Sequence, residues 1–290
     1  MFNGALTALI TPFRDGAVDE PALRDLVEWQ IQSGIDALVP CGSTGESATL
    51  THEEHERVIK ITIEQARKRV PVIAGTGSNA TAEAIHLTAS ARAMGADGAL
   101  LISPYYNKPT QEGIFRHYKL IAASVDLPLI VYNIPGRTAS NIAPETFARL
   151  AEIKNVVGVK EASGSMDQVS DILRLCGDRL TILSGDDALT LPIMALGGKG
   201  VISTASNAIP REMHDLAAAA LGGDFQRARE LHYRMLPLLR ALFIETNPIP
   251  LKHALALMGK CANELRLPLV PMTAPASEKL EAAMKALRLV

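Results

Sequence analysis

One lysine stands at the end of a strongly apolar run. In NVVGVKEASG (155–164), the residues before Lys160 are β-branched or small, which is typical of a strand buried on both faces of a parallel sheet. An ammonium in an apolar interior is costly unless it is paired or loses its proton. Because a neutral amine attacks carbonyl carbons, this position favours a lysine that forms a Schiff base. The alternative is a lysine that reaches the rim and pairs with Glu161.

The segment CGSTGES offers a second candidate site. Gly42 and Gly45 let the backbone turn its N–H groups toward a bound anion. No lysine follows the second glycine, so a carboxylate fits this loop better than a triphosphate. The hydroxyls of Ser43 and Thr44 could relay a proton. The alternative is an ordinary strand-to-helix turn in which the serine caps the helix.

Aromatic and basic residues follow two further apolar runs. Tyr132 ends LIVYN, one strand before Lys160, so its phenol could exchange protons with the amine during imine formation. Arg137 follows in the next loop, and its planar fork suits a second carboxylate. The alternatives are an interfacial aromatic and a surface charge. In SPYYNKP, Tyr105 and Tyr106 either cover a site or enter a subunit interface.

Two motifs resemble a dinucleotide-binding site and a zinc site, but the residues around them do not fit either group. GTGSNA (75–80) matches a dinucleotide-binding pattern, but Asp97, the acid about twenty residues on, precedes the next strand instead of following it. HEEHE (52–56) has one residue too few between its histidines for the zinc motif and no evident third ligand. We therefore predict no metal and no cofactor apart from a covalent imine on Lys160.

Eight short apolar runs predict the elements that position these residues. Each run ends in a small or polar residue, and most are followed by an amphipathic helical stretch, such as 21–34, 51–69 and 81–95. This repeat predicts a (β/α)₈ TIM barrel, which we favour over an open doubly wound sheet. The runs are ALTALITP, DALVPCGSTGES, VPVIAGTG, GALLISPYY, LPLIVYNIP, VVGVKEASG, LTILSGDD and GVISTASN.

The barrel prediction places the chemistry at the carboxyl ends of the strands, where sites in this fold lie. After Asn207 no run resembles a strand, so we predict a catalytic barrel over 1–224 and a C-terminal helical domain over 225–290. The polar residues that end the runs are then brought to one mouth.

Composition narrows the classes of function. The 290 residues are 48% hydrophobic and 21% charged, as in ordinary globular proteins, and the net charge of −2 argues against nucleic acid as a partner. No apolar run is long enough for a bilayer and no polybasic face stands out. MFNGALTALITPF is expected to be a strand, not a signal peptide. Three widely spaced cysteines fit a reducing cytoplasm.

Taken together, these motifs resemble the pyruvate-dependent class I aldolase family that includes N-acetylneuraminate lyase, and within it the dihydrodipicolinate synthase branch. The resemblance runs from GALTALITPF to NPIPLK and rests on GSTGES, PVIAGTGSN, PYYNKPTQEG, YNIPGRT, GVKEASG and LSGDDA in that order.

The resemblance implies a lyase that condenses pyruvate with L-aspartate 4-semialdehyde to 4-hydroxy-tetrahydrodipicolinate, in lysine and diaminopimelate biosynthesis. Lys160 would form the imine, Tyr132 would be the acid/base, and the Ser43 hydroxyl would link Tyr132 to Tyr106 of a neighbouring subunit. The resemblance further implies a homotetramer, a dimer of dimers. The remaining implied contacts are the pyruvate carboxylate at Ser43–Thr44, the semialdehyde carboxylate at Arg137, and carbonyls of Gly185 and Ile202 near the lysine.

An allosteric site for the feedback inhibitor L-lysine is implied as well. Its polar residue types suit an amino acid, with a glutamate for the ammonium group. The matching residues are Ser47, Ala48, His52, His55, Asn79, Glu83 and Tyr105.

Position 43 departs from the branch pattern, because most such synthases carry threonine where this chain has Ser43. The hydroxyl survives, but the missing methyl group loosens its rotamer. A serine here also occurs in the sialic-acid lyase branch. The alternatives are therefore a sister aldolase for N-acetylneuraminate or a 2-keto-3-deoxy sugar acid, and a non-catalytic barrel that senses pyruvate or an amino acid. Arg137 favours the synthase.

Overall fold

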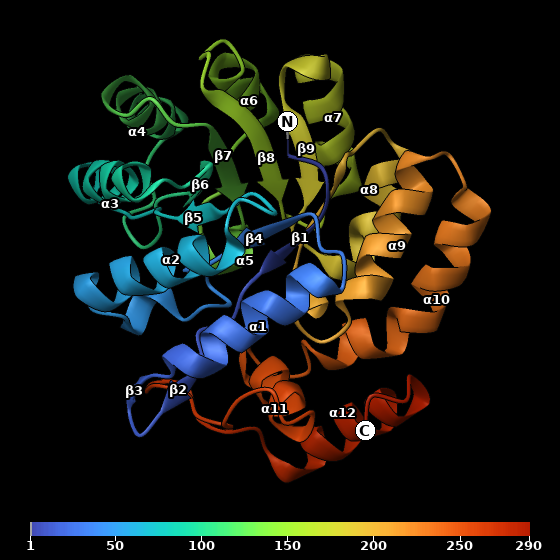
Figure 1. The fold of residues 1–290 in the computed structure, drawn as a ribbon. Helices are drawn as coiled ribbons and strands as arrows, with labels where there is room; N and C mark the ends of the chain where they lie inside the picture. The colour runs from blue at the N-terminus through green and yellow to red at the C-terminus, as the bar shows by residue number, and fades with distance from the viewer. Residues whose placement is uncertain (1) are drawn as a thin grey trace.

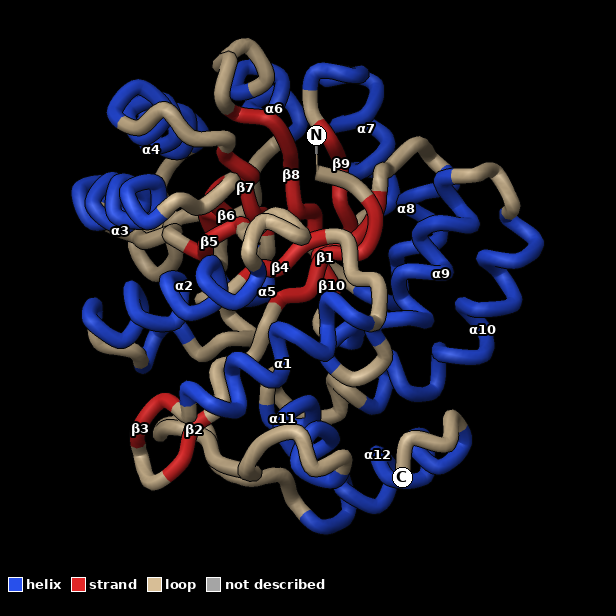
Figure 2. Tube along the Cα trace, in the orientation of Figure 1, coloured by secondary structure: helices blue, strands red, loops and turns tan. Residues whose placement is uncertain are grey.

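The computed structural model describes residues 2–290, and its centre is an eight-stranded parallel sheet. The strands follow the order β4-β1-β10-β9-β8-β7-β6-β5, and a bridge between Leu38 and Val72 joins the two outer strands, closing the predicted barrel (Figures 1 and 2). The strands are β1 (Gly4–Ala8), β4 (Ala37–Val39), β5 (Ile73–Gly75), β6 (Gly98–Ile102), β7 (Leu129–Asn133), β8 (Val156–Glu161), β9 (Thr181–Ser184) and β10 (Gly200–Ser203).

Helices surround the sheet, as Figure 2 shows in blue. Local signals set several of their ends: the Thr51 side chain and Glu54 form a capping box at the start of α2, and Gly95 ends α3 with a φ of +93°. The helices are α1 (Glu20–Gln32), α2 (His52–Ala66), α3 (Thr81–Met94), α4 (Gln111–Ser124), α5 (Pro135–Thr138), α6 (Pro144–Leu150), α7 (Met166–Cys176), α8 (Thr190–Ala195) and α9 (Pro210–Leu221).

Three further helices follow the barrel: α10 (Phe225–Ala241), α11 (Ile249–Leu257) and α12 (Ala274–Ala286). A small hairpin, β2 (Phe13–Arg14) with β3 (Ala17–Val18), lies near α11 in Figure 1. One hydrophobic cluster includes Leu9 of the barrel, Leu238 of α10 and Leu280 of α12. The C-terminal helices thus extend the core of the barrel, and the domain boundary at residue 224 stays a prediction.

Within residues 2–290 no helix combines the length and the apolar character needed to cross a membrane. The cysteines at 41, 176 and 261 are free thiols, and the first two are buried.

Candidate active site

Lys160 lies where the barrel predicts it, at the carboxyl end of β8. It is paired in register with Tyr132 on β7 and with Leu183 on β9. Only 5% of the lysine is exposed, and its Nζ lies 4.3 Å from the centroid of the Tyr132 ring. The strand register therefore brings amine and phenol ring together, as the sequence predicted.

The electrostatics of this pair favour an amine that can act as a nucleophile. Burial lowers the pKa of Lys160 to about 8, a shift that the Asp187 carboxylate opposes and the Arg137 guanidinium assists. Burial also raises the pKa of Tyr132, so the phenol stays protonated at neutral pH. The neutral fraction of the amine can attack a carbonyl carbon, and the neighbouring neutral phenol can donate a proton to the carbonyl oxygen.

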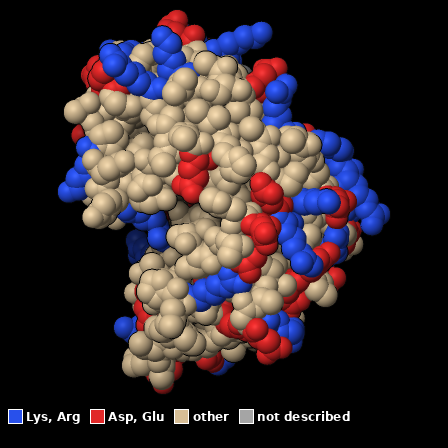
Figure 3. Space-filling view, turned by 90° about the vertical axis from the view of Figure 1, so that its left-hand side faces the viewer, with Lys and Arg blue, Asp and Glu red and all other residues tan. Residues whose placement is uncertain are grey.

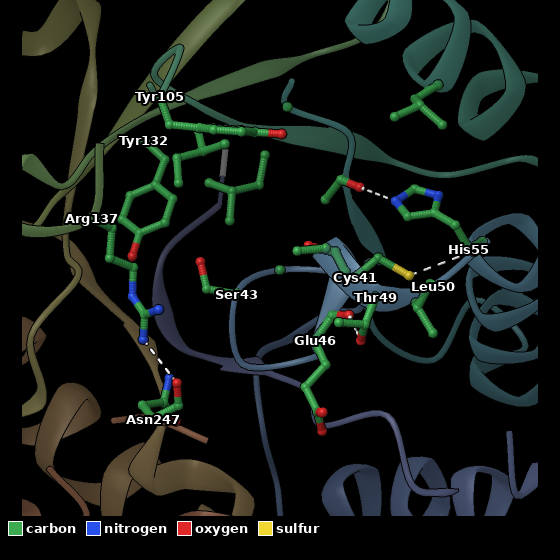
Figure 4. Close-up of a pocket in the computed structure, with 18 of the residues that line it drawn as sticks. Cys41, Ser43, Glu46, Thr49, Leu50, His55, Tyr105, Tyr132, Arg137 and Asn247 are labelled. Carbon is green, nitrogen blue, oxygen red and sulfur yellow. Dashed lines mark hydrogen bonds between the residues drawn. The ribbon is translucent and has the colours of Figure 1, made fainter. Parts of the chain in front are cut away.

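A cavity of about 450 Å³ opens beside this pair. Its lining includes Tyr132, Ser43 and Arg137, but not Lys160, which lies against the Tyr132 ring. Figure 4 shows the Tyr132 hydroxyl, the Ser43 hydroxyl and the Arg137 guanidinium facing the same space. Three of the predicted site residues thus converge on one cavity. Arg137 lies on the short helix α5, not in an irregular loop.

The glycine-rich loop after β4 turns as the sequence predicted. Gly42 O accepts hydrogen bonds from the backbone N–H groups of Gly45 and Ser47. No acceptor among the described residues faces the N–H groups of Ser43 or Thr44. These two N–H groups are free for an anion, whereas the Thr44 side chain is buried and bonded within the protein.

Gly185, directly after β9, makes room for the lysine side chain. A Cβ at this position would lie 2.7 Å from Ala162 Cβ, closer than real Cβ contacts come, and 3.1 Å from Lys160 Cγ, which is a tight contact. Ile202 of β10 is buried in a cluster with Tyr132. The implied contact of the Gly185 and Ile202 carbonyls with the amine stays a prediction.

The two adjacent tyrosines differ in their surroundings. Tyr105 lines the cavity, whereas Tyr106 is 89% exposed, has a φ of +71° and does not line the cavity. The Tyr106 side chain is therefore exposed to solvent and is not part of the cavity of its own chain. Its implied role across a subunit interface stays a prediction.

The cavity continues toward the residues implied for L-lysine. Ser47, Ala48, His52, His55, Glu83 and Tyr105 line it, and Asn79 does not. His52 Nε2 lies 2.9 Å from Glu83 Oε1, while His55 Nε2 lies 2.8 Å from Gly75 O and burial lowers the pKa of the His55 ring. The two histidines thus have separate partners.

Two carboxylates acquire roles that the sequence did not give. Asp187 is buried, and its Oδ2 accepts the N–H groups of Thr204 and Ala205 at 3.1 and 3.0 Å. Glu161 accepts from Asn133 Nδ2 at 3.1 Å and from the Ser163 N–H at 2.7 Å, so it ties the ends of β7 and β8 together.

The segment that follows the barrel contributes to the site through residues that sequence reasoning missed. Lys252 of α11 pairs with Glu46 at 2.5 Å, and both side chains are almost fully buried. Asn247 donates from Nδ2 to Thr44 Oγ1 at 2.9 Å, and its carbonyl accepts from Arg137 Nη2 at 2.9 Å. Asn247 lies in the NPIPLK segment, the only signal that could have pointed to it.

The fold and the site define a (β/α)₈ barrel with a buried lysine amine at its carboxyl mouth. Residues 1–287 match the model of the dihydrodipicolinate synthetase family. The chain is 60% identical over 285 residues to the 4-hydroxy-tetrahydrodipicolinate synthase of Syntrophus aciditrophicus, covering 98% of both chains. The protein therefore belongs to the dihydrodipicolinate synthetase family.

Solved structures agree with this assignment. Dihydrodipicolinate synthase from Aquifex aeolicus is 52% identical, with a TM-score of 0.98 over 99% of both chains. The enzyme from Cyanidioschyzon merolae, solved with lysine bound, is 43% identical, with a TM-score of 0.97 over 100% of this chain and 99% of that one.

Proposed function

We propose that the protein is a lyase that condenses pyruvate with L-aspartate 4-semialdehyde to 4-hydroxy-tetrahydrodipicolinate, in lysine and diaminopimelate biosynthesis. Full-length similarity to synthases of this name supports the reaction. The observation that carries the mechanism is the buried Lys160 amine against the Tyr132 ring at the barrel mouth.

The chemistry begins with attack of the neutral Lys160 amine on the ketone carbon of pyruvate. The Tyr132 phenol would protonate the oxygen that leaves as water, which gives an iminium. The free N–H groups of Ser43 and Thr44 suit the pyruvate carboxylate. The Tyr132 phenolate left by iminium formation would take a methyl proton, which gives an enamine. The enamine carbon attacks the aldehyde, and the phenol returns the proton to the aldehyde oxygen, which becomes a hydroxyl. The amino group of the second substrate then attacks the iminium carbon and closes the ring, and the bond from that carbon to Lys160 Nζ breaks and frees the lysine amine.

Arg137 is the proposed ligand of the semialdehyde carboxylate. Arg137→Ala should raise KM for aspartate semialdehyde by roughly 10- to 100-fold, because a charge-assisted hydrogen bond contributes about 1.5–3 kcal/mol. KM for pyruvate should change far less. A coupled assay with each substrate varied in turn measures both constants.

The same assay separates the synthase from its sister enzymes. The wild-type protein should turn over aspartate semialdehyde and not N-acetylneuraminate. Turnover of the sugar acid with an inert semialdehyde would assign the site to the sister aldolases. An unaltered semialdehyde KM in Arg137→Ala would remove Arg137 from the second-substrate site.

We also propose feedback inhibition by L-lysine at the cavity end formed by His52 and Glu83. The support is the continuous lining from Tyr132 to these residues, together with the lysine-bound relative. L-Lysine should inhibit the wild type, and Glu83→Gln should weaken this inhibition because it removes the charge that pairs with an ammonium group. Equal inhibition of both proteins would place the lysine site elsewhere.

We further propose that the protein is a homotetramer in the cytoplasm. The exposed Tyr106 ring supports a subunit interface through which it reaches a neighbour's site. Broad parts of the face in Figure 3, on the side of α3 and α4, carry no charged side chains. Light scattering should give four chains per particle, and a monomer that retains full activity would contradict the role of Tyr106.

A further inference from the structure

Asn247 joins the two groups that the proposed function assigns to substrate carboxylates. Only 6% of this residue is exposed, and it lines the same cavity as Ser43 and Arg137 (Figure 4). Its side chain donates to Thr44 Oγ1, and its backbone carbonyl accepts from Arg137 Nη2, both at 2.9 Å. One residue thus contacts both carboxylate-binding elements.

The Thr44 contact continues into the barrel. Thr44 Oγ1 lies 3.4 Å from Thr204 Oγ1, and the Thr204 N–H donates to the buried Asp187 carboxylate at 3.1 Å. The Thr44 hydroxyl therefore lies between the Asn247 amide, which donates to it, and the Thr204 hydroxyl. This contact holds the side chain of the residue whose free N–H group suits the first substrate.

The Asn247 backbone carbonyl orients the Arg137 guanidinium. A guanidinium carries five N–H donors in a rigid plane, so one bond to a carbonyl orients the rest without occupying them. The remaining donors can then form a bidentate contact with a carboxylate. The position of Asn247 thereby sets the direction of the Arg137 fork relative to Thr44.

We propose that Asn247 is a positioning residue that fixes the spacing between the pyruvate carboxylate site at Ser43–Thr44 and the second carboxylate site at Arg137. The proposal rests on the proposed function. Asn247 acts on pyruvate through the Thr44 hydroxyl, and on the second substrate through Arg137. Neither effect requires Asn247 to touch a reacting atom.

A double-mutant cycle with Thr44→Val tests this role. Valine keeps the shape and backbone N–H of Thr44 but lacks the hydroxyl that accepts from Asn247. Asn247→Ala should raise KM for pyruvate about tenfold, as loss of one hydrogen bond in a buried site does, with a change of less than about threefold in kcat. Thr44→Val should do the same, and the double variant should be no worse than either single variant.

A matched control comes from Asn155, at the amino end of β8. Its side chain donates to three backbone carbonyls in a partly buried position, so Asn155→Ala also removes side-chain hydrogen bonds, but at the end of the strand far from the mouth. This variant should unfold at a lower temperature but keep both KM values. An Asn247→Ala protein with unchanged pyruvate KM, or with a further tenfold rise in the Thr44→Val background, overturns the proposal.

Borohydride trapping separates this outcome from failure of the proposed function. If the wild type forms no pyruvate adduct on Lys160, the Schiff-base function itself is wrong. If the wild type does form the adduct, the pyruvate concentration that gives half-maximal trapping is compared between the wild type and Asn247→Ala. Equal concentrations would mean that only the role of Asn247 is wrong.

Discussion

Lys160→Met should abolish both synthase turnover and the borohydride-stable adduct with pyruvate while leaving the protein folded. Methionine fills a similar volume in the buried site but has no amine to attack a ketone. Because the variant no longer buries an amine, it should be at least as stable as the wild type. Mass spectrometry of the trapped protein and thermal unfolding measure the two effects. Exposed Lys154 supplies the control, because Lys154→Met should be trapped normally.

The pH dependence of trapping adds a second measurement of the same nucleophile. Burial lowers the pKa of Lys160 to about 8, so the neutral and reactive fraction of the amine grows as pH rises through that value. The rate of adduct formation should therefore increase from pH 6 to about 8 and level off above it. A rate that keeps rising toward pH 10 would mean that burial does not lower the pKa of the Lys160 amine. An adduct on Lys160→Met would remove the residue from the mechanism.

Breaking the buried ion pair between Lys252 and Glu46 should have the largest effect on stability. Lys252→Met leaves the Glu46 carboxylate inside the protein without its cation, and such uncompensated charges cost about 3–5 kcal/mol of unfolding free energy. The same change should raise KM for pyruvate, because Glu46 lies in the loop that carries Ser43 and Thr44. Urea unfolding at pH 7 and substrate kinetics measure the two effects.

Removing both charges supplies the control for this pair. Glu46→Gln combined with Lys252→Met should recover much of the lost stability, because no unpaired charge then remains buried. Arg116→Met, which removes an exposed partner of Glu112, should leave the unfolding midpoint nearly unchanged. If Lys252→Met is as stable as the wild type, the pair does not hold the loop.

Local patterns could predict the barrel and the residues at its strand ends. A parallel barrel gathers all strand carboxyl ends at one mouth, so Lys160 and Tyr132 follow from the repeat and from their place in each run. The direction of the Glu161 side chain could also have been predicted from the strand pattern. Neighbouring residues on a strand face opposite sides, so the residue after an inward lysine must point toward the surrounding helices. There it meets Asn133.

The contacts from the C-terminal helices could not be predicted in this way. Asn247 and Thr44 are 203 positions apart, and no strand register or helical period links them. Lys252 stands on a predominantly apolar helix, where the sequence does not show which buried acid pairs with it. Such partners depend on how α11 packs on the barrel mouth, which only the three-dimensional structure defines.

The order of synthesis gives these long-range contacts a further consequence. A nascent chain that has emerged through β10 already contains all eight barrel strands, Lys160, Tyr132 and the glycine-rich loop. It still lacks Asn247, Lys252 and the neighbours that hold this loop in place. Because domains form as their residues leave the ribosome, the barrel can close before its substrate loop is fixed. Full affinity for pyruvate is therefore expected only after residues 247–252 have been synthesised and have packed on the barrel mouth.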